Sequence, residues 1–185
     1  MKLLVAAHTS ELVAFEDALP GFVTLLTGVG KIPAAYALTR ALSAAEYDEI
    51  VVVGTAGAID PELPSGVHEI AAAIQHDVSD LDGIVGQHVF LPARVDVAAE
   101  GVMIATGDHF IDDADAVVAI RALGARMVDM ESYALAWVAQ EFGVPIRIFR
   151  AVSDRAQDGA TEEWDDAARV CSGWLRDSIR QHYGV

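Results

Sequence analysis

The most informative stretch of this chain reads Val128-Asp-Met-Glu-Ser-Tyr-Ala134, in which an apolar, strand-like run gives way to carboxylates. A second run of the same kind ends in Arg150-Ala-Val-Ser-Asp154. In an open α/β sheet, ligands bind beyond the carboxyl ends of the strands, so acids delivered there by two successive strands can converge on one small molecule. We therefore expect an α/β fold with a small-molecule site at these two strand ends.

Around these stretches, short β-branched runs alternate with longer helical ones, which is typical of a parallel βαβ architecture. Strands are expected at Lys2–Ala7, Phe22–Gly28, Glu49–Val53, His68–His76, Val102–Thr106, Arg126–Asp129 and Pro145–Val152. Helices are expected at Lys31–Ala45, Ser132–Phe142 and Thr161–Tyr183. The pattern contains no internal repeat or linker, so residues 1–185 are interpreted as a single domain.

Local signals support the three helices. Pro33 lies near the first turn of the first one, and Gly143 with Pro145 just beyond it ends the second. The third opens with Thr161-Glu-Glu-Trp, and its amphipathic spacing predicts that it covers one side of the sheet. Leu81-Asp-Gly-Ile-Val-Gly86 is interpreted as a turn or hairpin.

Composition and charge narrow the function classes. The chain has 185 residues, of which 53% are hydrophobic and 22% charged, and this suits one globular domain rather than a disordered chain. Its formal net charge of -16 repels phosphate backbones and anionic lipids, so nucleic acids and membranes are poor candidate partners. No apolar run approaches the ~20 residues of a membrane span. A small neutral or cationic molecule is the better candidate ligand.

Cysteine usage indicates the compartment. Cys171 is the only cysteine, so the chain forms neither an internal disulfide nor a cysteine zinc site, which favours a reducing environment. The apolar run at Met1–Ala7 stops at His8, too short for the core of a signal peptide, and is interpreted as the first strand. We expect a cytoplasmic protein.

Two glycine loops are ambiguous by themselves. Gly28-Val-Gly30 lies between a strand and a helix, as in a dinucleotide-binding fingerprint, but the third glycine of that pattern is missing. Gly54-Thr-Ala-Gly-Ala58 lets a ligand approach the backbone closely, or simply allows tight strand-to-helix packing. We expect no cofactor and no metal.

Taken together, five blocks resemble one family in order and spacing. They are Gly28-Val-Gly-Lys-Ile-Pro-Ala-Ala35, Val53-Gly-Thr-Ala-Gly-Ala58, Thr106-Gly-Asp-His-Phe-Ile111, Val128-Asp-Met-Glu131 and Arg150-Ala-Val-Ser-Asp154. The chain is similar to the nucleoside phosphorylase/nucleosidase superfamily, and within it to the 5′-methylthioadenosine/S-adenosylhomocysteine nucleosidases. The resemblance implies a nucleoside phosphorylase-like domain with a twisted mixed central sheet flanked by helices. It also implies a homodimer and a reaction at the bond between a purine and its ribose.

The resemblance assigns the sugar and base contacts. Met130 would pack on the sugar and Glu131 would hydrogen-bond its hydroxyls, with the neighbouring Asp129 also at the substrate. Phe110 would stack on the base while the backbone of Ile111 reads its edge. The other substrate-binding residues that it implies are Thr55, Ala56, Gly57 and Ser153.

Three residues are implied to be catalytic. Asp154, steadied by Ser153, would serve the purine N7, Glu11 would activate water, and Arg150 would help to hold that water. Breaking an N-glycosidic bond builds positive charge on the sugar and negative charge on the departing base. The reaction therefore needs an acid at the base and carboxylates near the ribose. Such a donor requires Asp154 to be protonated when the substrate is bound.

The acceptor, water or phosphate, separates a hydrolase from a phosphorylase. Phosphorolysis requires cations or a nest of backbone N–H groups to hold the phosphate. Related phosphorylases have an arginine where this chain has Val52, and a glycine-and-arginine loop where it reads Ala6-Ala-His-Thr-Ser10. We therefore expect hydrolysis of a 5′-modified adenine-type nucleoside, with a phosphorylase and a non-catalytic nucleoside-binding protein left open as alternatives.

Structural interpretations of the same residues also stay open. Glu11 would then be a solvated residue of the first helix, and Asp154 would be a turn or helix-cap residue. Glu131 would be an acid in the first turn of its helix that interacts with the helix dipole. Asp129 is shorter than the glutamate that is common at this position in the nucleosidases, and in this interpretation it only supports its loop. Phe110 would be a residue of the hydrophobic core. The tryptophans are interpreted as packing residues.

Two departures from the family bear on the substrate. His8 replaces an apolar position, and it would line the pocket for the 5′ group or face solvent. Part of the region between Asp80 and Gly107, which in relatives helps to form the dimer and that pocket, is missing. Methylthioadenosine, adenosylhomocysteine, 5′-deoxyadenosine and a futalosine-like nucleoside therefore all remain possible substrates.

Overall fold

A mixed, eight-stranded sheet forms the centre of the computed structural model, which describes residues 1–15, 17, 19–156 and 160–185, with the backbone alone for 160–163. The strands are β1 Lys2–Ala6, β2 Phe22–Leu26, β3 Glu49–Ala58, β4 Val67–Gln75, β5 Arg94–Asp96, β6 Val102–Thr106, β7 Met127–Asp129 and β8 Ile146–Asp154. The helices are α1 Lys31–Ala44, α2 Ala114–Ala122, α3 Ser132–Phe142 and α4 Ala160–Tyr183, with a 3-10 helix, η1, at Thr9–Phe15.

Part of the sheet closes on itself. β3 pairs with β8, β8 with β4, β4 with β6, β6 with β7, and β7 returns to β3. β1 and β2 continue the sheet outward from β3 in parallel, and β5 pairs with β4 at the other side. The closed ring brings the ends of β3, β7 and β8 to one place.

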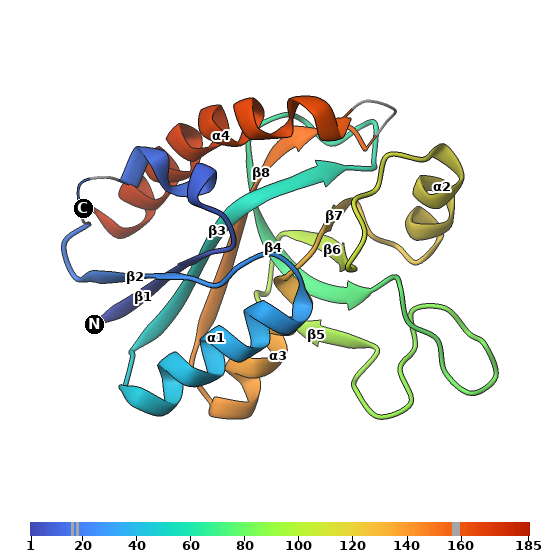
Figure 1. The fold of residues 1–185 in the computed structure, drawn as a ribbon, viewed down its shortest axis with the longest axis horizontal. Coiled ribbons are helices and arrows are strands. Elements are labelled where there is room, and N and C mark those ends of the chain that lie inside the picture. Colours follow the sequence, from blue (N-terminus) through green and yellow to red (C-terminus); the bar gives the residue numbers. More distant parts are fainter. Residues whose placement is uncertain (16, 18, 157–159) are drawn as a thin grey trace.

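Helices cover both sides of the sheet. α4 and η1 lie together against β3 and β8, whereas α1 and α3 pack on the opposite side and α2 lies beside β6 and β7 (Figure 1). β3 is buried on both sides: Val51 and Val53 contribute to the core beneath α4, and Ile50 and Val52 contribute to the core beneath α1 and α3. Such continuous apolar runs are typical of strands covered on both faces.

Most of the expected elements are confirmed within one or two residues, and Ser132–Phe142 is confirmed at both ends. Gly143 adopts the left-handed conformation as the α3 C-cap, as its position predicted. The 81–86 turn is also present, since Asp80 N donates to Ile84 O and Ser79 bridges Val85. The side chain of Thr161, which was expected to open α4, lies outside the described residues.

The sheet is mixed, as the resemblance implied, since β7 pairs antiparallel with β3, and β5 and β8 pair antiparallel with β4. Two differences from the sequence expectation have physical reasons. β3 continues to Ala58 rather than ending at Val53, since its glycine block stays paired with β8. β5 and α2 were not predicted: β5 has only three residues, and α2 depends on a local cap by Asp113. No helix in the described part of the chain combines the length and apolar character of a membrane span.

Candidate active site

A cavity of about 190 Å³ opens where β3, β7 and β8 end. Eleven of the site residues expected from the sequence line it: Glu11, Thr55, Ala56, Gly57, Phe110, Ile111, Asp129, Met130, Glu131, Ser153 and Asp154. Arg150 does not. The lining also contains His8, which the sequence analysis left open between the 5′ pocket and solvent, and residues that were not assigned to the site, namely Ala7, Val29, His109, Val128 and Trp164.

Glu11 comes from η1 and is only 3% exposed. Its Oε2 accepts hydrogen bonds from the N–H groups of Ala7 (3.1 Å) and His8 (3.0 Å). Its Oε1 accepts from Thr55 twice, from N at 2.7 Å and from Oγ1 at 3.1 Å. The carboxylate is therefore fixed at the cavity wall by donors alone, and a solvated surface position is excluded.

Glycines of the β3 block make room for these groups. A Cβ on Gly54 would collide with Arg150 Nη1 and lie 2.8 Å from Glu11 Oε1. A Cβ on Gly57 would lie 2.9 Å from Asp154 Oδ1. Side chains at these two positions would displace the acids, so the block serves the site as well as the packing of the strand.

Glu131 follows β7 and is 5% exposed. Its Oε1 accepts the N–H of Gly30 at 2.9 Å, and its Oε2 lies 3.6 Å from Arg150 Nη2. Burial raises the pKa of Glu131 to about 8, with Asp129 adding to the rise and the Arg150 guanidinium opposing it. This carboxyl group therefore stays protonated to a higher pH than that of a free glutamate.

Asp129 and Arg150 form a buried pair behind the cavity wall. Arg150 Nη2 donates to Asp129 Oδ2 at 2.5 Å, and both its Nε and Nη2 donate to Ser132 Oγ. Asp129 also accepts from Thr106 Oγ1 (2.7 Å) and from Ser132 N (2.9 Å). Although burial opposes the charged form, the nearby carboxylates raise the pKa of Arg150.

The sequence expectation placed Arg150 at the attacking water, and Asp129 at the substrate or in support of its loop. Arg150 is 1% exposed and does not line the cavity. Asp129 does line the cavity, but both of its oxygens are engaged by internal donors. The two side chains hold the strand ends, and through them Glu131, in place.

An irregularity in β8 determines the direction in which the Asp154 side chain points. Ala56 pairs with Val152 and Gly57 with Asp154, so Ser153 is an extra residue in the strand. Asp154 Oδ2 accepts from Ser153 Oγ (2.7 Å), and Oδ1 accepts from the N–H of Ala156 (2.8 Å). Ala156 has a φ of 50°, a conformation uncommon for alanine, which marks a tight turn at the site.

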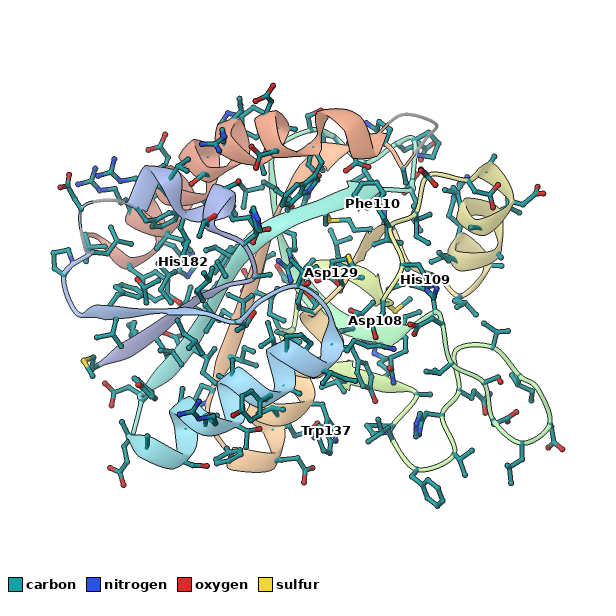
Figure 2. The ribbon with its side chains drawn as sticks, in the orientation of Figure 1. Asp108, His109, Phe110, Asp129, Trp137 and His182 are labelled. Carbon is teal, nitrogen blue, oxygen red and sulfur yellow. The ribbon has the colours of Figure 1, made fainter. Side chains whose placement is uncertain are left out.

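The opposite wall of the cavity consists of His109, Phe110 and Ile111. Figure 2 shows Asp108, His109 and Phe110 on the segment that follows β6, near Asp129. Asp108 Oδ1 accepts the N–H of Lys31 (2.8 Å), and its own N–H donates to Asp77 Oδ2 (2.9 Å). Lys31 Nζ lies 2.6 Å from Asp77 Oδ1. We call Lys31, Asp77 and Asp108 the clasp.

The charges of the clasp favour its contacts, because the Lys31 ammonium lies beside the Asp77 carboxylate. Burial alone would raise the pKa of Asp77, but the Lys31 ammonium and the Asp108 N–H together hold it below its usual value. The clasp ties the start of α1 to the segment that carries Phe110.

Trp164 was interpreted as a packing residue, yet it lines the cavity. Its Nε1 donates to Thr55 Oγ1 at 3.1 Å, and its ring contacts the His8 ring edge-on at 5.3 Å between centroids. His8 also lines the cavity, so its exposure to solvent alone is excluded. A tryptophan at the start of an amphipathic helix carries no sequence signal that separates these roles, because its contact partners lie on β3 and in the segment just before η1.

Comparison with known proteins agrees with this geometry. The family model described as the phosphorylase superfamily matches residues 20–173. The 5′-methylthioadenosine/S-adenosylhomocysteine nucleosidase of Marinomonas sp. is 31% identical over 173 residues, covering 81% of this chain and 75% of the relative. That of Geobacillus kaustophilus is 33% identical over 157 residues, covering 72% and 67%.

Solved structures share the fold. The nucleosidase of the same name from Helicobacter pylori, in complex with a substituted pyrrolidin-3-ol, superposes with a TM-score of 0.86 at 19% identity, covering 99% of this chain and 97% of that one. The futalosine hydrolase of Helicobacter pylori superposes with a TM-score of 0.87 at the same identity and coverage. At this identity the likeness establishes the architecture, whereas the family follows from the sequence match. The chain thus belongs to the phosphorylase superfamily.

Proposed function

We propose that this chain is a purine nucleosidase that hydrolyses the N-glycosidic bond of a 5′-modified adenine-type nucleoside and releases the free base and the sugar. The observation that carries the proposal is the convergence of Glu11, Glu131 and Asp154, from three separate elements, on one cavity. The relatives that are 31% and 33% identical are named for methylthioadenosine and adenosylhomocysteine, which supports that substrate class.

Glu131 and Met130 would hold the ribose. Glu131 Oε1 is occupied by the Gly30 N–H, whereas Oε2 has only the 3.6 Å ion pair with Arg150 among the described residues. Oε2 is thus the oxygen that can accept from ribose hydroxyls. As positive charge develops on the sugar in the transition state, the ionised form of Glu131, which predominates above its pKa of about 8, stabilises that charge.

Asp154 would protonate the departing base. Ser153 Oγ and Ala156 N both donate to its carboxyl oxygens, which fixes the direction in which the group points. When N7 of the purine takes a proton from Asp154, the negative charge that accumulates on the base is neutralised and the bond to the sugar weakens. Phe110 and Ile111 would place the base from the opposite wall.

Glu11 would activate the attacking water. It lies on the wall formed by η1 and β3. Three backbone N–H groups and the Thr55 hydroxyl donate hydrogen bonds to its carboxylate and fix its position. A carboxylate held in this way can accept the proton that water loses as it attacks the sugar. Arg150 would act as a positioning residue, since it contacts Asp129 and Ser132 rather than the cavity.

Water is favoured over phosphate as the acceptor by the charge of the cavity. Among the described lining residues there is no lysine or arginine, while Glu11, Asp129, Glu131 and Asp154 contribute carboxyl groups. Val52, which stands where related phosphorylases have an arginine, is buried in the core. A phosphate dianion would meet carboxylates without a cation to offset them.

The test is a panel of four nucleosides: methylthioadenosine, adenosylhomocysteine, 5′-deoxyadenosine and futalosine. Each is assayed for liberated base with and without phosphate. We expect base release and free sugar in phosphate-free buffer. Strict dependence on phosphate would identify a phosphorylase, and binding without base release would identify a nucleoside-binding protein. Either result contradicts the proposal.

We further propose a cytoplasmic homodimer. The single cysteine, Cys171, is buried and free, which suits a reducing compartment. Several large apolar side chains are strongly exposed in the isolated chain, including Phe90 at 90%, Leu81 at 88% and Ile32 at 79%. Light scattering during size exclusion tests the dimer, and a mass of 19.6 kDa rather than twice that value would contradict it.

A further inference from the structure

We infer that Trp164 is a positioning residue for Glu11, acting through the hydroxyl of Thr55. This inference rests on the proposed function, since it assumes that Glu11 activates water. The indole is not itself a catalytic group here. Its N–H is the first member of a chain of hydrogen bonds that runs from α4 through β3 to η1.

The numbers of protons and lone pairs on the Thr55 hydroxyl determine the direction of each hydrogen bond in this chain. The Thr55 hydroxyl has one proton and two lone pairs. The indole Nε1, which can only donate, fills one lone pair at 3.1 Å. The hydroxyl proton then points to Glu11 Oε1, also at 3.1 Å, and no other donor among the described residues fills the second lone pair. Without the indole N–H, the hydroxyl rotates freely and holds Oε1 less firmly.

Other contacts show that α4 holds the whole segment around Glu11. The next residue, Asp165, accepts a hydrogen bond from Ser10 Oγ. About two turns further along α4, Ser172 Oγ donates to the backbone oxygen of Glu11 at 2.7 Å. The Trp164 ring also packs against His8, whose N–H donates to Glu11 Oε2. Trp164 is thus linked to both oxygens of the carboxylate.

η1 depends on these links because it is not part of the sheet. A 3-10 helix has poorer hydrogen-bond geometry than an α-helix and rarely defines a rigid position alone. The Glu11 carboxylate must nevertheless stay within a fraction of an ångström of its productive position. Contacts from α4 supply that constraint, with Ser172 holding the backbone and Trp164 the side chain.

A double-mutant cycle between Trp164 and Thr55 tests the inference. Trp164→Phe keeps an aromatic ring at the cavity but removes the N–H, and Thr55→Val removes the hydroxyl at nearly constant volume. We expect Trp164→Phe to lower kcat for methylthioadenosine about 5-fold, the worth of one hydrogen bond, with KM within about twofold. In the Thr55→Val background the same change should have no further effect.

Trp174→Phe is the matched control. Trp174 lies on the same helix, is 42% exposed and does not line the cavity, so its substitution should leave kcat unchanged. Independent, additive losses from Trp164→Phe and Thr55→Val would overturn the inference. So would equal behaviour of Trp164→Phe and the control.

An NMR measurement separates this inference from the proposed function. The chain has three tryptophans, so its three indole N–H signals can be assigned by single Phe substitutions. We expect Thr55→Val to shift the Trp164 signal and accelerate its hydrogen exchange, and to leave the Trp174 signal in place. If the native protein releases no base, the proposed function fails, and an unmoved Trp164 signal independently rejects the hydrogen-bond chain.

Discussion

The two walls of the cavity are held in place by different physical means. The wall at the ends of β7 and β8 rests on a buried charge network, in which Arg150 contacts Asp129 and Glu131 and is 1% exposed. The wall formed by His109, Phe110 and Ile111 lies on an irregular segment, held at its start by the partly exposed clasp. Disrupting the first should therefore endanger the fold, and disrupting the second should affect mainly ligand binding.

The largest effect is expected from Arg150→Met. This change leaves Asp129 and Glu131 buried without a cation, and removing one member of a buried network destabilises proteins by about 3–5 kcal/mol. Urea denaturation at pH 7.5 measures the loss. The control is Arg147→Met on the same strand, since Arg147 makes a two-point ion pair with Glu69 but is about a quarter exposed. We expect the control to lose about 1 kcal/mol or less. Equal losses would contradict the assignment of the buried network as the main support.

Asp154→Asn tests the chemistry at the tip of β8. Asparagine preserves the shape and can still accept the Ala156 N–H, but it has no acidic proton for the base. We expect turnover of methylthioadenosine to fall by at least ~10²-fold while the thermal midpoint stays near that of the native protein. Near-normal turnover in a folded variant would exclude Asp154 as the acid.

Glu131→Gln tests the electrostatics of the same wall. Burial raises the pKa of Glu131 from its usual value of 4.5 to about 8. Between these two pH values the native state binds more protons than the unfolded state, so the free energy of unfolding should fall as pH rises from 5 to 8. Glutamine cannot titrate, and its variant should lose this part of the slope. Glu141→Gln, at the exposed end of α3, serves as the control and should keep the native slope. Urea denaturation at pH 5 and pH 8 gives the change in the free energy of unfolding for the native protein and for both variants. The same pH dependence in all three proteins would contradict the raised pKa of Glu131.

The wall at the ends of β7 and β8 also shows how much of the site could be predicted from the sequence. The acids at the ends of β7 and β8 could be predicted, because each follows an apolar run and the ends of neighbouring strands meet. The positions of Arg150 and Asp154 relative to the cavity could not. Regular alternation would put both on one face of β8, but the extra residue Ser153 interrupts it, and only Asp154 lines the cavity.

Contacts between distant elements account for the other omissions. Trp164 reaches Thr55, 109 residues away, and the clasp joins α1 to the ends of β4 and β6. Nothing in the local periodicity of α4 distinguishes a residue over a cavity from one over the core. The lining residue His109 and the role of Asp108 likewise depend on which segments the fold brings together.

Asp108→Ala tests the second wall and should have the smallest effect. It removes the acceptor for the Lys31 N–H, so the segment carrying Phe110 loses its direct tie to the start of α1 and keeps only the link through Asp77. Because Asp108 is exposed, stability should change little, while KM for methylthioadenosine should rise about 3- to 10-fold as the base loses an ordered stacking surface. Asp113→Ala is the control: Asp113 caps α2 through the N–H groups of Asp115 and Ala116, so its loss should cost about 1 kcal/mol of stability without raising KM. If Asp108→Ala unfolds the protein and leaves KM unchanged, the clasp supports the fold rather than the ligand, and the two walls do not differ in the way proposed.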